Sequence, residues 1–499
     1  MDTATGTLAR YKMFIGGEWV DAASGEHFES DNPYTGKPWA LIPRGSAQDV
    51  DRAVRAAHKA FTSGEWPKLT ASKRGALLRK LGDLVGERSR FLAEIEVRDN
   101  GKLYAEMSAQ TAYMAQWYYY YGGLADKIEG HVIPSDKPDM FNYTRYEPLG
   151  VVAAIVPWNS PLLLTAWKLA PALAAGNTVV IKPSEFTSAS ALEFMKLVEQ
   201  AGFPPGVVNV VTGFGPDGGM PLVEHPLTAK VAFTGSDRTG TLICQAAAKG
   251  LKRVSMELGG KSPNIVFDDA QMDNAVKGVI SGIFAATGQT CIAGSRLLVQ
   301  RTIHDEFVDK LVAFAKTAKM GNPMNPDTQV GPVTNPPQFK KILDYIDIAR
   351  GEGAKPVLGG SRATRPECGT GWFVEPTIFT GVKNSMRIAQ EEVFGPVLAV
   401  IPFEDEEEAV AIGNDVVYGL AAGVWTQNMR RALTMAERLQ AGTVWVNTYR
   451  AVSYLSPFGG YKRSGLGRES GQEMIKDYLQ VKSVWISTAS EVPNPFILR

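Results

Sequence analysis

Apolar runs alternate with amphipathic stretches from Val151 to Gly250, and this alternation predicts a series of strands and helices. The runs that predict strands are Val151–Val156, Thr178–Lys182, Val207–Val211 and Lys230–Phe233, and the stretches that predict helices are Pro161–Ala175, Ser188–Ala201 and Asp237–Lys249. Continuously apolar strands between helices are typical of a parallel sheet that is covered on both faces. The pattern therefore predicts a nucleotide-binding α/β architecture, with ligands at the carboxyl ends of the strands.

The chain before this region is mostly helical in pattern. Ser46, with Asp49 three residues later, predicts the capped start of a helix that runs through Phe61. Turns or hairpins are expected at Phe14–Val20 and Asn32–Gly36, and further helices at Ser72–Glu87, Phe91–Asn100 and Tyr104–Tyr121.

A second α/β segment is expected from Asn264 to about Thr443. It includes a helix-like stretch at Asp273–Phe284, a strand-like one at Arg296–Val299, a helix through Phe307–Lys319 and the loop Glu391–Pro396. Two strand-like pieces stand apart from both α/β segments, at Phe141–Tyr146 and Val481–Ile486.

Length and composition narrow the class of protein. A chain of 499 residues is expected to form two to three domains. Its 52 basic and 52 acidic residues balance, which gives no electrostatic sign of a nucleic-acid partner. The start of the chain lacks the apolar core of a secretory signal, and no apolar run reaches membrane-spanning length. We therefore expect a cytoplasmic protein that binds neither nucleic acid nor membrane.

Three cysteines, Cys244, Cys291 and Cys368, lie far apart and show neither a disulfide framework nor the spacing of metal ligands, so no metal site is expected. Cys291 lies in Gly288–Gly294, a small-residue stretch that predicts a tight connection between a helix and a strand. Substrate can reach a cysteine at such a junction, and nearby backbone N–H groups can stabilise thiolate or oxyanion charge. From the loop alone, a catalytic and a buried structural cysteine are equally good interpretations.

Two glycine-rich turns are candidates for binding a phosphate. Gly213–Gly218 matches G-x-G-x-x-G after a strand, and Thr234–Gly240 follows a strand and opens a helix whose N–H groups favour an anion. Composition does not choose between them, and either could be an ordinary turn.

Polar side chains follow three of the predicted strands. Glu185, beside Lys182, could accept hydrogen bonds from ribose hydroxyls, although these two residues alone fit a solvated loop pair better. Glu257 ends an apolar strand, where burial raises the pKa of a carboxyl group and makes it a useful base. Asn159 ends another strand, and its amide could donate to an oxyanion.

Eight motifs occur in consistent order along nearly the whole chain. They are PWN at Pro157, WKLAPALAAGN at Trp167–Asn177, KPSE at Lys182, FTGS at Phe233, MELGGK at Met256, GQTC at Gly288, EEVFGP at Glu391 and SPFGGYKRSGLGRE from Ser456 to Glu469. Together they resemble the aldehyde dehydrogenase superfamily, in its hydrolytic, NAD(P)-dependent branch that does not acylate coenzyme A.

The resemblance implies an α/β fold with a Rossmann-like parallel-sheet cofactor domain, an α/β catalytic domain and a small β oligomerisation arm. Residues 1–124 and 148–258 would form the discontinuous NAD-binding domain, 259–474 the catalytic domain, and 125–147 with 475–499 the arm. The two isolated strands belong to this arm, whose edges would pair with a partner subunit in a homodimer or homotetramer.

The resemblance also implies the reaction. Cys291 would attack the aldehyde, with the oxyanion held by the Asn159 side chain and the Cys291 N–H. Hydride transfer to nicotinamide would leave a thioester, hydrolysed to the carboxylic acid by water that Glu257 activates. Relatives that acylate coenzyme A typically lack this carboxylate. Lys168 and Glu469 match positions for proton relay.

NAD is the implied cofactor, with NADP possible, because Glu185 favours NAD although some relatives with this glutamate accept both. The pyrophosphate is expected near the second glycine-rich turn, not the first. The residues implied in cofactor binding are Pro157, Trp158, Lys182, Glu185, Gly235, Ser236, Gly259, Glu392 and Phe394.

The implied substrate pocket has two small wall residues. Ser160 and Ala285 stand where an aromatic residue is common in relatives, which predicts a roomier pocket and an aromatic, cyclic or otherwise bulky aldehyde. Arg450 lies in the loop that resembles the substrate-anchoring loop, where it could bind a substrate carboxylate bidentately, face solvent or pair with an acid. The residues implied in substrate binding are Tyr113, Ser160, Trp167, Ala285, Thr290, Arg450, Val452 and Phe458.

Three alternatives stay open. A carboxylated semialdehyde held by Arg450 is the alternative substrate. A thiol esterase that uses Cys291 with Glu257 would need no cofactor residues, and a non-catalytic structural relative would tolerate the loss of either residue. All of these residues are present in the chain.

Overall fold

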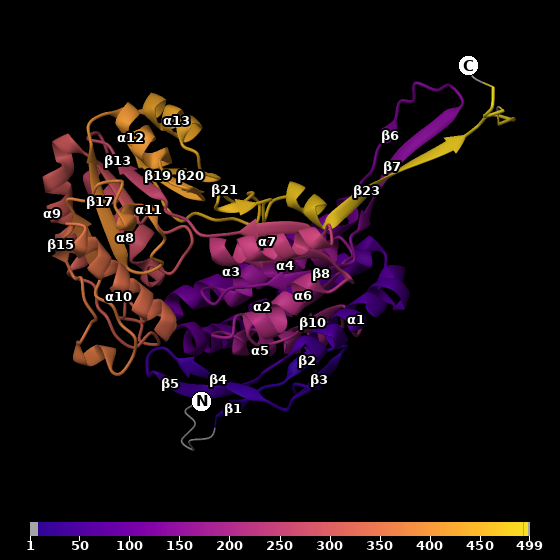
Figure 1. Cartoon of the computed structure of the whole chain (residues 1–499), viewed down its shortest axis with the longest axis horizontal. Coiled ribbons are helices and arrows are strands. Elements are labelled where there is room, and N and C mark those ends of the chain that lie inside the picture. Colours follow the sequence, from indigo (N-terminus) through magenta and orange to yellow (C-terminus); the bar gives the residue numbers. More distant parts are fainter. Residues whose placement is uncertain (1–7, 493, 498–499) are drawn as a thin grey trace.

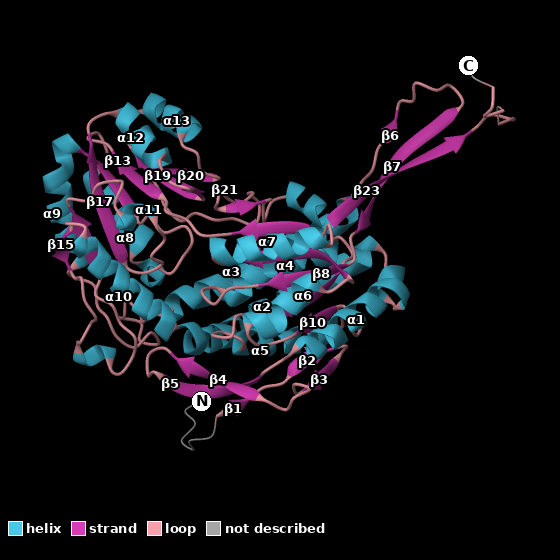
Figure 2. Cartoon of the chain, in the orientation of Figure 1, coloured by secondary structure: helices cyan, strands magenta, loops and turns pink. Residues whose placement is uncertain are grey.

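Two largely parallel sheets organise the chain, and the computed structural model describes residues 8–492 and 494–497 of it (Figures 1 and 2). Within these residues the first sheet has eight strands, in the order β22-β12-β11-β8-β9-β10-β2-β3. The strands are β2 (Met13–Ile15), β3 (Glu18–Val20), β8 (Val151–Ile155), β9 (Thr178–Lys182), β10 (Val208–Val210), β11 (Thr228–Thr234), β12 (Arg253–Glu257) and β22 (Gly465–Leu466). The five from β8 to β12 run parallel, as the alternating pattern predicted.

Helices cover both faces of this sheet. They are α1 (Ala47–Ser63), α2 (Ala71–Asn100), α3 (Tyr104–Leu124), α4 (Pro161–Ala174), α5 (Ala189–Ala201), α6 (Met220–Glu224) and α7 (Asp237–Lys249). Side chains of β8 alternate between the faces: Val152 and Ala154 pack with α2 to α5, whereas Val151 and Ala153 pack with α1, α6 and α7. Burial on both faces explains why the strand is continuously apolar.

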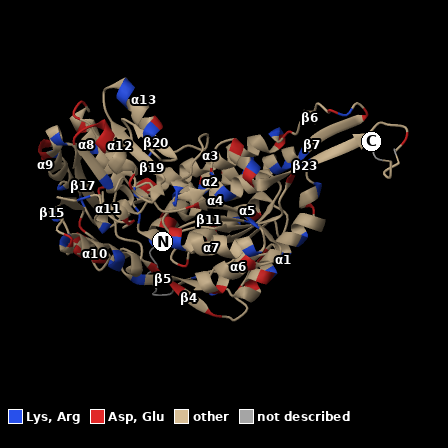
Figure 3. Cartoon of the chain, turned by 45° about the horizontal axis from the view of Figure 1, so that its top comes forward, with Lys and Arg blue, Asp and Glu red and all other residues tan. Residues whose placement is uncertain are grey.

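The second sheet has the order β15-β16-β17-β14-β13-β19-β20 among the described residues. Its strands are β13 (Pro263–Val266), β14 (Arg296–Gln300), β15 (Lys355–Leu358), β16 (Thr377–Thr380), β17 (Val397–Phe403), β19 (Ala421–Trp425) and β20 (Thr443–Val446). Its helices are α8 (Met272–Ile283), α9 (His304–Ala315), α10 (Pro336–Gly351), α11 (Arg387–Gln390), α12 (Glu406–Asn414) and α13 (Met429–Arg438). In Figure 3 basic positions of α13 lie close to acidic ones of α12, where Arg431 pairs with Glu406 and Arg438 with Glu407.

Smaller strands complete the fold. They are β1 (Ala9–Arg10), β4 (His27–Asn32) and β5 (Lys37–Pro43) in one small sheet, β18 (Tyr418–Gly419) and β21 (Tyr461–Lys462) in another, and β6 (Val132–Ile133), β7 (Met140–Pro148) and β23 (Leu479–Ser487) in a third. The third sheet extends away from the rest of the molecule (Figure 1). It joins the two strand-like pieces that the sequence left isolated, with Phe141 opposite Ile486 and Tyr146 opposite Val481.

Most predicted elements are confirmed, with two corrections. The predicted helices Ser72–Glu87 and Phe91–Asn100 are one helix, α2. The residues between them include neither proline nor glycine, and the charged ones lie on the exposed face of the helix, so nothing interrupts it. The helix expected through Phe307–Lys319 is α9, which begins at His304 and ends at Ala315. The capping box of Ser46 and Asp49 is present at the start of α1.

The domain boundaries remain a prediction. The short strand β22 pairs with β12 and so joins the first sheet, although it lies within the range predicted for the catalytic domain. None of the described helices combines the length and the apolar character that crossing a membrane requires.

Asn177 ties the base of the arm to α4. Its Oδ1 accepts hydrogen bonds from the N–H of Leu149 (2.8 Å) and Gly150 (3.0 Å), and its Nδ2 donates to the carbonyls of Ala172 (3.1 Å) and Tyr478 (2.9 Å). The side chain is fully buried, so its loss leaves backbone groups unpaired away from water.

We therefore expect Asn177→Ala to lower the free energy of unfolding by about 3 kcal/mol or more. Thermal unfolding followed by circular dichroism measures the change. The control is Asn274→Ala, because exposed Asn274 makes a single local bond to Gln271 and should cost less than about 0.5 kcal/mol. Equal unfolding temperatures for the two variants would contradict the assignment.

Candidate active site

The carboxyl ends of the first sheet form one edge. The register pairs Ile155 with both Lys182 and Phe233, and Thr234 with Glu257, so β8, β9, β11 and β12 end together. From β8 the chain proceeds to β9 and β10 on one side and then returns to β11 and β12 on the other. Ligands of open α/β sheets bind at such a switch point.

This edge carries many of the residues that the sequence singled out. Pro157, Trp158 and Asn159 follow β8, Lys182 ends β9, Gly235 and Ser236 follow β11, and Glu257 ends β12. The sequence therefore predicted correctly that these residues follow strands.

The cysteine loop connects α8 to β14, as predicted. Ala286 and Thr287 have left-handed backbones, with φ of 52° and 55°, and Gly288 has φ of 66°. A Cβ atom on Gly288 would lie 2.1 Å from the carbonyl oxygen of Gly395, in the loop before β17. Gly288 therefore allows two loops of the second sheet to approach closely beside Cys291.

Hydrogen bonds from three directions hold this loop. Asn159 Nδ2 donates to the Gln289 carbonyl at 3.1 Å, which joins the end of β8 to the cysteine loop. Tyr449 Oη donates to the Ile292 carbonyl at 3.0 Å, and the Ala286 N–H donates to Glu106 Oε1 at 2.9 Å. An amide carries two hydrogens, so one N–H of Asn159 stays available for an oxyanion.

Burial and nearby carboxylates control the Cys291 thiol. Desolvation, with smaller contributions from Glu257 and Glu392, raises its pKa to about 12, while the Lys102 ammonium acts in the opposite direction. The free protein therefore holds Cys291 almost entirely as the neutral thiol near neutral pH.

Glu257 is a buried carboxyl group without a hydrogen-bond partner among the described residues. Burial, reinforced by the charge of Glu469, raises its pKa well above the usual range. Next to it, Lys168 Nζ donates to Glu469 and, at 2.6 Å, to Thr234 Oγ1. Lys168 and Glu469 are buried as well, and both are close enough to Glu257 to influence its pKa.

The two glycine-rich turns differ in structure. A Cβ on Gly213 would lie 2.8 Å from the Gly45 carbonyl oxygen, so close backbone packing explains this glycine, and the turn continues through a π-helical turn at Gly215–Gly219 into the short α6, with no side-chain cap at its start. Ser236 instead caps the 13-residue α7 and accepts the Thr239 N–H at 3.2 Å. The N-terminus of α7 is the better anion site because a regular, capped α-helix begins there, and its role remains a prediction.

Other predicted cofactor residues lie around the same edge. Lys182 is buried and lies 3.7 Å from the half-buried Glu185 carboxylate. Glu392 Oε1 accepts the Gly260 N–H at 3.0 Å, and a Cβ on Gly259 would collide with its carboxylate. The Trp158 and Phe394 rings meet edge to face, with centroids 5.2 Å apart.

An aromatic cluster includes three of the predicted substrate residues. Trp167 stacks on Trp117 with ring centroids 5.7 Å apart, and it contacts Phe458 edge to face with centroids 5.0 Å apart. Tyr113 contacts Trp117 edge to face with centroids 5.3 Å apart. Tyr113 is 40% exposed and also contacts Tyr454. Trp117 and Tyr454 were not predicted, because their helix and loop hold many aromatic residues and the sequence does not show which side chains converge.

Ser160, expected to leave space, instead meets two polar side chains. Lys102 Nζ donates to Ser160 Oγ at 3.0 Å, and Gln110 Nε2 donates to the same oxygen at 3.3 Å. The sequence analysis missed both residues. The C-cap Gly101 of α2 marks where a loop begins, but no sequence signal places the following lysine against a residue 58 positions away.

The other predicted substrate residues lie on the two loops. Ala285 and Thr290 flank the left-handed turn and are half-buried, and Val452 packs against the main core. Arg450 has a left-handed backbone, with φ of 66°, and its Nη1 makes a 3.4 Å hydrogen bond to the Ser281 carbonyl. Within the described ranges, no three His, Cys, Asp or Glu residues come together as metal ligands.

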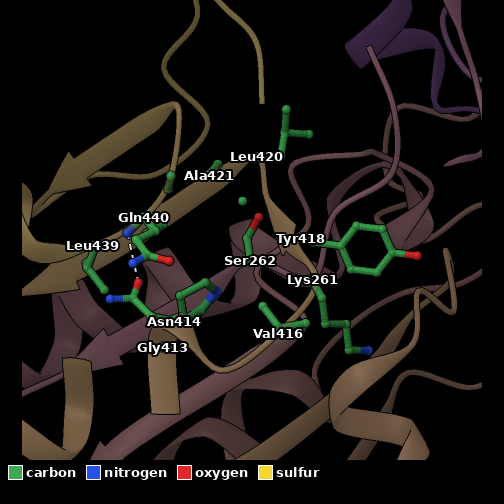
Figure 4. A pocket seen from close by; sticks show the side chains of 14 residues that line it. Lys261, Ser262, Gly413, Asn414, Val416, Tyr418, Leu420, Ala421, Leu439 and Gln440 are labelled. Atoms are coloured by element: carbon green, nitrogen blue, oxygen red, sulfur yellow. Dashed lines mark hydrogen bonds between the residues drawn. The ribbon is translucent and has the colours of Figure 1, made fainter. Parts of the chain in front are cut away.

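A small cavity of about 10 Å³ lies beside β13 and β19 (Figure 4). Lys261, Ser262, Tyr418 and Leu420 contribute to its lining, and it has room for about one water molecule. Cys291 does not line it, and its size excludes an aldehyde substrate.

Comparison with known proteins identifies the family. The model of the "Aldehyde dehydrogenase family" matches residues 19–484. The chain is 48% identical over 495 residues to the (Z)-2-((N-methylformamido)methylene)-5-hydroxybutyrolactone dehydrogenase of Acinetobacter baylyi, covering 99% of this chain and 100% of that one. It is 47% identical over 478 residues to human mitochondrial aldehyde dehydrogenase, covering 95% and 92%.

Solved structures of similar fold point to the same family. Betaine aldehyde dehydrogenase of Staphylococcus aureus, in complex with NAD+, has a TM-score of 0.96 at 41% identity, covering 97% of this chain and 96% of that one. The NAD+ complex of an aldehyde dehydrogenase from Bacillus cereus has a TM-score of 0.94 at 45% identity, covering 96% and 97%. The chain belongs to the aldehyde dehydrogenase family, which confirms the resemblance and the fold class.

The raised pKa of Cys291 predicts how alkylation of the free protein depends on pH. Thiolate is the reactive form, so carbamidomethylation of Cys291 by iodoacetamide should accelerate about tenfold per pH unit from about pH 7 to about pH 10. Peptide mass spectrometry measures the rate, and Cys291→Ser gives the background. A rate that levels off by about pH 9 to 10 would show a thiol of ordinary or lowered pKa and contradict the prediction.

Proposed function

We propose that the protein is an NAD-dependent aldehyde dehydrogenase that oxidises an aldehyde to the carboxylic acid. The observation that carries the proposal is the grouping around Cys291. An amide donor from Asn159 lies at one side, and the buried Glu257 carboxyl, which has no hydrogen-bond partner among the described residues, influences the thiol electrostatically. The NAD+ complexes of the two similar structures support the cofactor.

The residues at the edge of the first sheet fit NAD. The N–H groups at the start of α7 would bind the pyrophosphate, Glu185 the adenosine ribose and Glu392 the nicotinamide ribose. Glu185 would also repel a 2′-phosphate, so NAD is favoured over NADP. When bound, NAD+ supplies the acceptor for the hydride of the substrate.

In the first half of the reaction the Cys291 thiol loses its proton to water, and the thiolate sulfur attacks the carbonyl carbon of the aldehyde. The oxyanion accepts hydrogen bonds from the free N–H of Asn159 and from the Cys291 N–H. Loss of hydride from this thiohemiacetal leaves a thioester on Cys291. Covalent attachment divides a difficult oxidation into two easier steps.

In the second half Glu257 takes a proton from the water that hydrolyses the thioester. Its raised pKa makes the ionised carboxylate a strong base, and its ionised fraction grows as the pH rises through that value. Lys168 and Glu469 would carry the proton away from Glu257. A carboxylate at this position favours release of the free acid, and the esterase and structural alternatives explain fewer of these contacts.

Two sets of residues near the site favour different substrates. The aromatic cluster supports a bulky or cyclic aldehyde, which remains a prediction. The polar contacts at Ser160 favour the alternative, a carboxylated semialdehyde, because a buried ammonium and an amide reach the position that was expected to be empty. A 5-hydroxybutyrolactone, named for the Acinetobacter relative, opens to an aldehyde that carries a carboxylate, which supports the same choice.

We propose that the protein forms a homodimer or homotetramer through its arm. The outer strand β23 exposes Val481 (61%), Trp485 (52%) and Ile486 (46%), and one of its edges has no strand partner among the described residues. Exposed apolar side chains on an unpaired strand edge favour pairing with another chain.

The division of roles predicts the kinetics of Glu257→Gln. With NAD and an aldehyde, the variant should produce a burst of about one NADH per subunit and then turn over about 10²–10⁴-fold more slowly than the wild type, because only hydrolysis of the thioester needs the base. Stopped-flow absorbance measures both phases, and exposed Glu367→Gln is the control. Unchanged turnover, or loss of the burst as well, would contradict the assigned role.

Glu185 predicts the cofactor preference. Glu185→Gln removes the charge that would repel a 2′-phosphate and should raise kcat/KM for NADP about tenfold while changing that for NAD less. The control is Glu199→Gln on α5, where Glu199 bonds to Trp19 Nε1 at 3.1 Å. An unchanged ratio of the two kcat/KM values would show that Glu185 does not select the cofactor.

A further inference from the structure

Lys102 brings a buried positive charge next to the oxyanion residue. Its side chain is 4% exposed, and its ammonium donates to the hydroxyl of Ser160, which directly follows Asn159. Gln110 donates to the same hydroxyl oxygen, and its own Oε1 is buried without a partner among the described residues. Because Ser160 Oγ accepts two hydrogen bonds, its hydrogen remains free to donate.

Arg450 brings a second positive charge to the same region. It lies in the loop after β20, and its one hydrogen bond among the described residues is long, 3.4 Å from Nη1 to the Ser281 carbonyl. Arg450 and Cys291 are both close enough to Lys102 to influence its pKa, which burial lowers to about 8. Lys102 therefore lies near the reactive thiol, and Arg450, from a separate element, is close enough to Lys102 for the two charges to interact.

The nearby acids compensate these charges only in part. Glu106 accepts the Ala286 N–H and Glu96 accepts the Leu162 N–H at 2.9 Å, while the Lys102 ammonium bonds to the Ser160 hydroxyl. Burial raises the pKa of Glu96 to about 7, so this group is only partly ionised near neutral pH.

An ammonium buried only to support the fold would gain most from a direct ion pair with one of these carboxylates. The geometry instead directs it, with Ser160 and Gln110, to a shared point next to Asn159. Buried charges with incomplete pairing concentrate at functional sites.

We propose that Lys102, Ser160 and Arg450 form a receptor for a carboxylate on the aldehyde substrate, which makes short semialdehydes the preferred substrate class. The proposal rests on the proposed function and extends it. Because Ser160 directly follows Asn159 in the chain, a carboxylate bound at Ser160 and an aldehyde bound at Asn159 would belong to one short substrate. The neighbouring aromatic cluster would pack against the carbon chain.

The kinetic test compares succinic semialdehyde with butanal, a neutral aldehyde of the same chain length, in the presence of NAD. The wild type should prefer the semialdehyde. Lys102→Met and Arg450→Gln should each lower its kcat/KM about 10- to 100-fold, mainly through KM, because a charge-assisted hydrogen bond is lost. Butanal should change by less than about threefold in Arg450→Gln. Arg430→Gln, at an exposed arginine of α13, is the matched control and should match the wild type for both substrates.

Parallel losses for both aldehydes in Lys102→Met and Arg450→Gln would overturn the receptor and assign these residues to the reaction or the fold. Equal wild-type kcat/KM for the two aldehydes would also overturn it. If Lys102→Met does not fold, the result for Arg450→Gln decides, because that residue is on a half-buried loop.

A second experiment separates failure of the receptor from failure of the proposed function, because it needs no turnover. Succinate should slow the alkylation of Cys291 by iodoacetamide in the wild type, whereas butyramide should not, and Lys102→Met should lose this protection. Protection without oxidation of any aldehyde would support the receptor and contradict the dehydrogenase. Absence of protection, with oxidation of butanal intact, would overturn the receptor alone.

Discussion

The hydrogen bond from Asn159 to the Gln289 carbonyl joins the two sheets at the point where chemistry is proposed. Asn159 is placed by the carboxyl end of β8, and Gln289 lies in the loop that leads to β14. The bond fixes the oxyanion donor relative to the cysteine two residues further along. Gly288 makes this geometry possible, because any side chain there would collide with the Gly395 backbone.

Burial sets the electrostatics of the site. Cys291 and Glu257 have raised pKa values for the same first reason, desolvation, and each carboxylate nearby adds to the effect. Burial therefore favours the neutral form of both the thiol and the carboxyl group in the free protein. Lys102 and Lys168 are the buried cations that oppose this tendency, one on the side of Ser160 and the other beside Glu469.

The sequence predicted what depends on local pattern and on strand order. The parallel strands, the loop around Cys291 and the strand-end positions of Asn159 and Glu257 follow from apolar runs and from the polar residues that end them. The glycine-rich turn at Gly213 shows the limit of a motif, because close packing against Gly45 explains its glycine.

Contacts between distant segments could not be predicted in this way. Lys102 meets Ser160 only because α2, α3 and α4 pack together, and a small residue at position 160 was interpreted as empty space. The continuous α2 was missed because its charged exposed face resembled a break. The pairing of β7 with β23 joins segments more than 300 residues apart, for which the sequence offers no local signal.

The most direct test of the central claim is the intact mass of the protein after it is mixed with NAD and an aldehyde and quenched in acid during turnover. The account predicts an adduct on Cys291 that equals the mass of the aldehyde less two hydrogen atoms, which is the mass of the oxidised thioester. An adduct with the full mass of the aldehyde would show attack without oxidation. An adduct on another residue, or none at all, would contradict Cys291 as the nucleophile.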